Sequence, residues 1–417
     1  MTLAPTSAGE PRAGQGTARS NKGGHVSTSS STVGQSITDR LKKTVFRFDA
    51  SDKGELRGFQ RKMFGERVWQ VDEAYNRWLF DEVPDRDADG PQVWVCKRQG
   101  QIVGQQCGIP FRLKARDREI PASWANSLMV LPEWRMRGAF TPLAEAQLDS
   151  RPLAMAIHIS DSAYKAYSKA GWIDIGALPA YVFPLDTRRC VEASSLQGRM
   201  RTIGAIAGPA LHGARIGGHL LSRATGARFE EIGRFDGRAD AIWRRSSPHY
   251  PLIALRDLTH LRWRYDAIPC ASDYRRFMLT RGDEPLGYVV LRRETWRKEP
   301  CLAIVDYLCE PKWLWVLLSH TLRIAATERA TALICRTLNT RAERTFLAMG
   351  MMKVPDRVGF PVRVMAHPGP EAGIDRDEFA DRGNWLLTMG DGDASFLMHN
   401  TLPETAGLQP EGVAVQG

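Results

Sequence analysis

Hydrophobic and polar positions recur along the chain with two different periods. Short apolar runs on either side of a polar turn occur at 93–104 and again at 277–287, and this pattern is typical of a β-hairpin. The segments 157–172 and 333–351 each begin as an apolar strand and continue with helical spacing. Both end in Gly followed by a large apolar residue, which is where a helix C-cap needs a left-handed residue.

The same order of patterns occurs in both halves of the chain. Trp78 and Trp263 each stand six positions before a proline, Pro84 and Pro269, and a hairpin and a strand–helix segment follow each pair. An internal repeat of this length indicates a duplicated structural unit. We therefore predict an α/β (α+β) fold with two similar modules, each a mixed, mostly antiparallel twisted sheet flanked by helices.

These patterns divide the chain into five parts. We expect the modules at 44–188 and 236–400, joined by a basic connector at 189–235. Residues 1–43 are rich in Gly, Ser, Thr and Pro and poor in large apolar side chains, so we expect a disordered N-terminal tail without the apolar core of a secretion signal. Residues 401–417 are expected to form a loose C-terminal tail.

Composition narrows the class of protein. The 417 residues are 43% hydrophobic and 25% charged, which suits two globular domains. Apolar runs are too short to span a bilayer. The seven cysteines are scattered without a C-x-x-C pair or a metal-ligand spacing, so we expect reduced thiols, no metal site and a cytoplasmic location.

The net charge of +10 does not indicate a nucleic-acid partner, because the basic residues are spread among nearly as many acids. The segment from Arg199 to Arg228 is different, since it holds five arginines and no acidic residue. It has two interpretations: a connector between the modules, or an amphipathic helix that contacts an anionic membrane surface. We favour the connector, because its many glycines disfavour an isolated helix.

The first module contains a turn suited to binding phosphate. In the segment 127–143 an apolar strand is followed by Pro132, a basic turn with Gly138, and an apolar-periodic helix. A helix N-terminus presents unpaired N–H groups, glycine allows close approach of an anion, and Arg135 and Arg137 add positive charge. The alternative is an ordinary strand-to-helix turn.

This segment resembles motif A of the GNAT N-acetyltransferases. Val130, Pro132, Arg135 and Gly138 fall on the motif's positions, whereas Phe140 stands where the family has Gly or Ala and resembles members linked to polysaccharide gene sets. The resemblance implies GNAT-like modules and acetyl-CoA as co-substrate. The residues it implies for the coenzyme site are Leu128, Met129, Val130, Arg135, Met136, Arg137, Gly138, Ala139 and Phe140.

A second segment resembles the family's later helix motif. Ala163, Tyr167 and Gly171 match, Trp172 replaces Phe and Ser160 replaces Asn. The resemblance implies direct attack of the acceptor on the thioester, without a covalent enzyme intermediate. It also implies that the Tyr167 hydroxyl protonates the departing thiolate.

The general base cannot be assigned from the sequence. Many members of the family carry a carboxylate three or four residues before the motif's Val, and here those positions are Ser127 and Asn126. His158, on an expected strand, is a candidate base, but we favour a structural histidine. We interpret the run 384–393 as a turn, because it lacks the ligand pattern of a calcium loop.

The second module has no equivalent phosphate-binding turn. The segment 304–318 contains no Arg-x-x-Gly pattern, and Phe346 stands where Tyr167 stands in the first module. We interpret this module as a degenerate copy that shapes an acceptor site in the cleft between the two.

The sequence thus favours an acetyl-CoA-dependent acyltransferase acting on an amine or hydroxyl of a small-molecule or glycan acceptor, with a sugar or polysaccharide precursor suggested only by the resemblance. Two alternatives stay open. One is aminoacyl transfer from tRNA, as in the peptidoglycan-bridge transferases that are also tandem GNAT-like proteins, although the basic turn argues against it. The other is a non-catalytic binding protein with the same fold.

Overall fold

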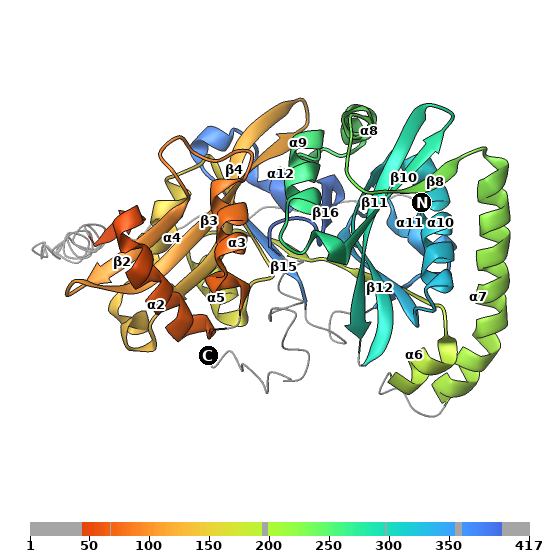
Figure 1. Cartoon of the computed structure of the whole chain (residues 1–417), viewed down its shortest axis with the longest axis horizontal. Helices are drawn as coiled ribbons and strands as arrows, with labels where there is room; N and C mark the ends of the chain where they lie inside the picture. The colour runs from red at the N-terminus through yellow and green to blue at the C-terminus, as the bar shows by residue number, and fades with distance from the viewer. Residues whose placement is uncertain (1–43, 67, 194–198, 297, 355–360, 394–417) are drawn as a thin grey trace, which may run out of the picture.

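The computed structural model describes residues 44–66, 68–193, 199–296, 298–354 and 361–393, and the expected tails at 1–43 and 401–417 lie outside them. A continuous twisted sheet runs through two halves of the molecule and is flanked by helices (Figure 1). Pairing is parallel between β4 and β5, β12 and β13, and β9 and β16, and antiparallel in the other described pairs. The predicted mixed α/β, mostly antiparallel fold is confirmed.

The first half is a five-stranded unit in which the expected hairpin is formed by β2 and β3. Its strands are β1 (Val45–Arg47), β2 (Val93–Arg98), β3 (Gln101–Ala115), β4 (Arg118–Val130) and β5 (Leu153–Ile157), paired in this order. Its helices are α2 (Lys53–Phe64), α3 (Glu73–Asn76), α4 (Phe140–Leu148) and α5 (Asp161–Lys169).

The second half repeats this order of pairing. Its strands are β8 (Arg228–Ile232), β10 (Tyr274–Arg281), β11 (Glu284–Trp296), β12 (Glu299–Cys309) and β13 (Ala332–Leu338). Its helices are α8 (Arg238–Ser246), α9 (Leu258–Leu261), α10 (Leu314–Thr327) and α11 (Glu343–Ala348). In both halves the helix α4 or α10 connects the two strands that pair in parallel, as a crossover connection must.

The two halves exchange strands. β7 (Ala180–Pro184) leaves the first half and lies between β13 and β14 (Met352–Val354) of the second. In return, β15 (Arg363–Pro368) leaves the second half and lies between β5 and β6 (Ile173–Ala177) of the first. The division of the chain near residue 188 stays a prediction, but strand pairing crosses it in both directions.

Two short strands close the sheet between the halves. β9 (Leu252–Ala254) pairs with β3 on one side and with β16 (Trp385–Thr388) on the other, and β16 also pairs with β13. The order β3-β9-β16-β13 therefore makes one sheet of the two halves. The segment after β16 consequently starts from the centre of the molecule.

The repeated tryptophans meet at the centre. Trp78 lies in a π-helical turn (Arg77–Asp81) and Trp263 in another (Arg262–Asp266). Their rings stack with centroids 4.9 Å apart at 13°. Each indole Nε1 donates to the backbone oxygen of the other tryptophan, at 2.7 and 2.9 Å. Because each buried indole N–H is satisfied by the partner, the pair fixes the halves in a nearly symmetric arrangement.

The arginine-rich segment forms a long helix. α7 (Arg199–Ala224) follows α6 (Thr187–Ala193) and packs against α10 at the edge of the second half (Figure 1). The glycines disfavour an isolated helix, but α7 is not isolated, because it packs against α10 and α6. A Cβ at Gly208 would lie 2.8 Å from Thr187 Oγ1, so glycine permits the close packing that stabilises the helix.

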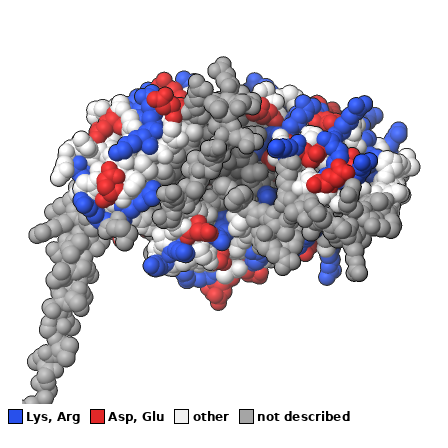
Figure 2. Space-filling view, turned by 90° about the horizontal axis from the view of Figure 1, so that it is seen from below, with Lys and Arg blue, Asp and Glu red and all other residues white. Residues whose placement is uncertain are grey.

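Charge is mixed over the surface. Figure 2 shows Lys and Arg side chains interspersed with Asp and Glu over the described part of one face. Within the described residues, no helix is long and apolar enough to cross a bilayer. The short helix α12 (Arg376–Ala380) precedes β16 in the chain.

Candidate functional site

The basic turn after β4 has the backbone expected of an anion-binding loop. β4 ends at Val130, a 3₁₀ turn spans Pro132–Arg137, and Gly138 is left-handed with φ 76° and ψ 15°. Glycine adopts this conformation without strain. The nine-residue α4 then begins with Ala139 as its N-cap, whose side chain offers no cap hydrogen bond. The N–H groups of Phe140 and Thr141 are therefore left for an external acceptor, while Pro142, the third residue of the helix, has no N–H to donate.

The two arginines of the turn are exposed. Arg135 Nε donates to Val130 O at 3.2 Å, which folds its side chain back over the end of β4. The Arg137 guanidinium lies 5.2 Å from the centre of the Trp134 ring. Within the described part of the chain neither forms an ion pair with a carboxylate, so their charge is available to a phosphate. The side chain of Met136 lies outside the described part.

β4 is distorted where it leaves β5. The β3–β4 register skips one residue between Gln105 and Cys107, and Ser127 has φ 50°, which marks a β-bulge. The parallel pairing of β4 with β5 ends at Trp124 and Met155, although β4 continues to Val130. Beyond this pair the segment Asn126–Val130 diverges from β5, and we call this site of divergence the β4–β5 fork.

Tyr167 lies against the fork from one face of the sheet. Its ring is 3% exposed and stacks on Trp172 at 4.3 Å, with Phe140 at 6.2 Å. Leu128 and Ala125 of β4 pack against the same cluster. Burial raises the pKa of Tyr167, so the phenol stays protonated at neutral pH. The structure thus brings together Leu128, Phe140 and Tyr167 of the sequence-predicted site.

The C-terminal segment reaches the same fork. After β16 the chain turns, and Gly392, with φ 59°, passes between Trp124 and Ile157; a Cβ there would lie 2.5 Å from Ile157 Cγ2. The next residue is Asp393, whose Oδ2 accepts a hydrogen bond from Asn126 Nδ2 at 2.6 Å. The Asp393 carboxylate therefore lies next to Asn126, the position on β4 at which the strand itself provides only an amide.

The Asp393 carboxyl is nearly enclosed. The residue is 7% exposed, and burial raises its pKa to about 7, partly opposed by the positive charge of Arg264. The carboxyl therefore changes protonation close to neutral pH.

A buried ionic network fixes the loop that carries Asp393. Arg256 donates through Nε to Asp306 Oδ1 at 3.1 Å and through Nη2 to Asp391 Oδ2 at 2.8 Å. The Tyr288 hydroxyl also donates to Asp306, at 2.9 Å, and the Thr388 N–H donates to Asp391, at 2.8 Å. The three charged side chains are at most 5% exposed. The network ties the start of the loop to β12 of the second half.

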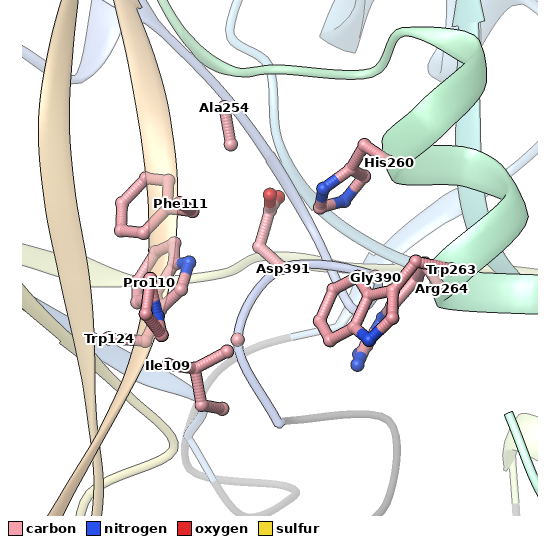
Figure 3. Close-up of a pocket in the computed structure, with 11 residues that line it drawn as sticks. Ile109, Pro110, Phe111, Trp124, Ala254, His260, Trp263, Arg264, Gly390 and Asp391 are labelled. Carbon is pink, nitrogen blue, oxygen red and sulfur yellow. The ribbon is translucent and has the colours of Figure 1, made fainter. Parts of the chain in front are cut away.

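A narrow pocket opens beside this loop, between the two halves. Figure 3 shows Phe111 and Trp124 of the first half facing His260 and Trp263 of the second, with Asp391 between them. Trp124 and Asn126 are two residues apart on β4 and so face the same side of the sheet. Burial beside Arg256 and Arg264 lowers the pKa of His260 to about 3, which keeps its imidazole neutral. A wider pocket lies between α2 and the Arg77–Asp81 turn.

The second half differs at each corresponding point. β12 leads through the turn Pro311–Trp313 straight into α10, without a left-handed glycine. Phe346 is fully buried and stacks on Tyr181 at 4.7 Å. Where β13 parts from β12, it pairs instead with β16. In this half, the position that corresponds to the β4–β5 fork is therefore occupied by β16.

One further sequence candidate, His158, has a structural explanation. His158 has φ 56° at the end of β5, and burial together with the charge of Arg336 lowers its pKa, so it is neutral at pH 7. Within the described residues, no group of three or more His, Cys, Asp or Glu side chains could hold a metal ion.

Comparison with protein families agrees with this geometry. Residues 51–173 match the family described as "Acetyltransferase (GNAT) domain". The chain contains a GNAT acetyltransferase domain. The match ends before β7, so the GNAT sheet of this half is completed from outside the matched segment, by β15. The GNAT part of the sequence resemblance is confirmed. No curated protein sequence matches the chain.

Solved structures show the same fold at low sequence identity. A GCN5-related N-acetyltransferase from Anabaena variabilis ATCC 29413 has a TM-score of 0.50 and 12% identity, covering 78% of this chain and 72% of that one. A conserved protein from Enterococcus faecalis V583, described as a probable N-acyltransferase, has a TM-score of 0.53 and 11% identity, covering 78% and 71%. These likenesses extend well beyond residues 51–173 and concern the fold alone.

Sequence reasoning missed Asp393 and interpreted its segment as a turn. The available signal was the apolar run 385–389 directly before two aspartates, since a buried strand places the residues that follow it near the core. Of these two aspartates, Asp391 belongs to the buried ionic network, and Asp393 reaches the β4–β5 fork.

We predict that Arg256→Met lowers the free energy of unfolding by about 3–5 kcal/mol at pH 8, because it leaves Asp306 and Asp391 buried without their cation. Burial already raises the pKa of Asp391, and Arg256 opposes this rise; without the guanidinium the pKa of Asp391 in the folded state rises further, so the variant should recover stability as the pH falls towards 5. Urea denaturation at both pH values measures this.

The matched control is Arg116→Met, which removes an arginine that is 70% exposed and paired with Glu378, and should change stability by about 0–1 kcal/mol. Equal losses for the two variants would contradict the assigned role of the network.

Proposed function

We propose that the protein is an acyl-CoA-dependent acyltransferase that moves an acetyl group to an amine or hydroxyl acceptor. The observation that carries this proposal is the basic turn Arg135–Gly138 between a bulged β4 and the uncapped N-terminus of α4, within a GNAT domain. Isothermal titration with acetyl-CoA, and separately with tRNA, tests it. Binding of tRNA alone would favour aminoacyl transfer, and binding of neither would favour a non-catalytic protein.

The residues of the first half suit each part of a coenzyme. The first-turn N–H groups of α4, Arg135 and Arg137 would hold the pyrophosphate. The backbone of Leu128–Val130 at the fork would hold the pantetheine arm and polarise the acyl carbonyl. Acetyl-CoA, when bound, supplies the activated acyl group. Tyr167, which packs beside Leu128 and stays protonated, would give its proton to the departing thiolate.

The two halves support a tandem arrangement with a single coenzyme site. Strand order, the parting of parallel strands and the helix after each parting are repeated. The left-handed glycine and the phenol are present in the first half, whereas the second has a direct turn into α10 and Phe346. The second half would then act as scaffold and as one wall of the acceptor site.

The acceptor would enter by the pocket between the halves. Phe111, Trp124 and Trp263 give it flat apolar walls, and the neutral His260 gives it a polar edge. Aromatic faces with a few polar groups suit a ring-shaped polar molecule. The free volume of the pocket is about 10 Å³, room for about one water molecule, so an amino sugar or a related glycan precursor as acceptor rests on the resemblance at Phe140.

We expect Gly138→Val to weaken acetyl-CoA binding at least about tenfold, or about 1.4 kcal/mol, because valine is strained at φ 76° and crowds the anion. Gly226→Val is the control, since Gly226 also has positive φ, with open space around it. Calorimetry should show one acetyl-CoA per chain for wild type and for Gly226→Val. Wild-type affinity in a folded Gly138→Val, or two sites per chain, would refute the assignment.

Tyr167→Phe should lower kcat by on the order of a hundredfold with little change in acetyl-CoA affinity, because it keeps the stacked ring and removes the proton donor. Tyr164→Phe should change kcat little, since Tyr164 lies on the exposed side of the same helix and its hydroxyl donates to Asp174 of β6. Release of free thiol from acetyl-CoA with glucosamine as acceptor measures both. Equal rates for Tyr167→Phe and wild type would exclude the role.

A further inference from the structure

The acyl transfer needs a group that removes the acceptor's proton, and the fork offers one that β4 does not itself encode. Asn126 has no acid–base function, but its Nδ2 donates to Asp393 Oδ2 at 2.6 Å. Asn126 and Trp124 lie on the same face of β4, and Trp124 lines the pocket between the halves. The carboxylate is thus positioned beside the proposed acceptor entrance.

The position of Asp393 is fixed by the two residues that precede it. The preceding Gly392 fits between Trp124 and Ile157 only because it lacks a Cβ. Asp391, one residue earlier, is held by Arg256 in the buried network. The loop therefore cannot shift the carboxylate without breaking an ion pair or displacing β5.

The phenol of Tyr167 and the carboxylate approach the fork from opposite faces. Tyr167 packs with Ala125 and Leu128, whereas Asn126 projects to the other side of β4. An acid and a base on opposite sides of a thioester are arranged as direct transfer requires, because one proton leaves the acceptor and another must reach the sulfur.

We propose that Asp393 is the general base of the reaction, positioned by Asn126; this rests on the proposed acyltransferase function. As the acceptor nitrogen or oxygen forms its bond to the acyl carbon, its proton passes to the Asp393 carboxylate. The carbon–sulfur bond breaks, and the thiolate takes the Tyr167 proton. Asp393 then releases its proton to water, and Tyr167 regains one.

Burial and charge place the titration of this base in a measurable range. The pKa of about 7 arises from burial and is opposed by Arg264, the side chain whose positive charge acts on it. Asp391 lies in the same loop but is compensated by Arg256. The rate should therefore rise with pH through about 7 as the carboxyl ionises.

The experiment compares wild type, Asp393→Asn and the exposed control Asp377→Asn in thiol release from acetyl-CoA with glucosamine, from pH 5.5 to 9. Asp393→Asn should lose about a hundredfold in kcat, keep its acetyl-CoA affinity and lose the rise with pH. Asn126→Leu should shift the rise to higher pH, because it removes the donor that favours the ionised carboxylate. Asp377→Asn should behave as wild type.

Stability gives a readout that does not need turnover. Because the pKa of Asp393 is raised in the folded state, the folded protein binds the extra proton between about pH 4 and 7, and stability should fall as pH rises through this window. Asp393→Asn should remove that component. An active wild type with an unchanged pH profile in Asp393→Asn would overturn the assignment of the base alone. A wild type that neither binds acetyl-CoA nor releases thiol would overturn the proposed function and the base with it.

A second and independent inference concerns helix α7. Most of its described exposed positions are apolar, with Ile216 43%, Leu220 60% and Leu221 66% exposed, while His212 and Arg223 are the polar ones. The other exposed apolar positions are Pro209, Ala210, Gly213, Ala214 and Ala224. These positions recur at three- and four-residue spacing, so they lie along one face. Leucines this exposed are unusual on a surface that contacts only water.

Uncompensated positive charge lies next to this face. Burial lowers the pKa of His219, and the positive charges of Arg323, Arg223 and Arg215 lower it further, which places these arginines around one point on α7 and α10. In the described part of the chain, none of the three forms an ion pair with a carboxylate. The segment 199–228 contains no acidic residue. An apolar face beside unpaired arginines is complementary to an anionic lipid surface.

We infer that α7 docks the protein onto an anionic membrane, lying along the lipid surface with Ile216, Leu220 and Leu221 inserted between headgroups. The helix lies at the outer edge of the second half, away from the first (Figure 1). Docking there leaves the pocket between the halves free for an acceptor.

The test is co-sedimentation with vesicles of phosphatidylcholine alone and with added phosphatidylglycerol. Binding should require the anionic lipid and weaken with salt. Leu220→Glu with Leu221→Glu should abolish it, and Arg215→Gln or Arg223→Gln should weaken it roughly fivefold each. Phe46→Glu is the matched control, because Phe46 is 49% exposed on β1 in the other half. Absence of binding to anionic vesicles, or a dimer that only the leucine variants dissociate, would overturn the proposal.

Discussion

The exchange of β7 and β15 is the constraint on which the rest of the molecule depends. Each half lacks a strand of its own sheet and takes it from the other, so neither fork can form without both halves. Backbone hydrogen bonds of a buried strand cannot be left unpaired at low cost. The relative position of the halves is thus set by main-chain pairing and strengthened by the reciprocal hydrogen bonds of Trp78 and Trp263. A pocket between two such halves has fixed walls.

This constraint explains why a buried ionic network can be tolerated at the centre. Arg256, Asp306 and Asp391 come from three segments that meet where β9 and β16 join the halves, and desolvating them costs more than an apolar cluster of the same size. What the network does is fix one loop in one position. Asp391 is held to β12 of the second half, and Asp393, two residues later, is thereby held against Asn126 of the first. The desolvation of these charges is thus tolerated at a place where the network fixes the loop that carries Asp393.

Local patterns predicted the parts of the fold that depend on local interactions. The spacing of Trp78 and Trp263 to their prolines identified the repeat, and the sequence around Gly138 predicted a turn that the structure shows to be left-handed. The same patterns could not predict the exchange, because an apolar strand such as Ala180–Pro184 reads identically whichever sheet it joins. They also gave too little weight to a helix at α7, because the packing that stabilises this glycine-containing helix involves residues distant in the sequence. Asp393 was missed for a related reason, since its partner Asn126 lies far away in the sequence.

The two halves show how a repeated fold becomes asymmetric at one point. Gly104 pairs with Val130 and Gly287 with Cys309, and three residues before each end of strand stand Ser127 and Asp306. Asp306 is neutralised by Arg256 and covered by β16, which closes the fork of the second half. The fork of the first half receives only Gly392 and Asp393 from the same segment. A single stretch of chain, 385–393, therefore fills one fork with a strand and places a carboxylate at the other. The strand that occupies the second fork thus also positions Asp393, the residue that we propose as the base.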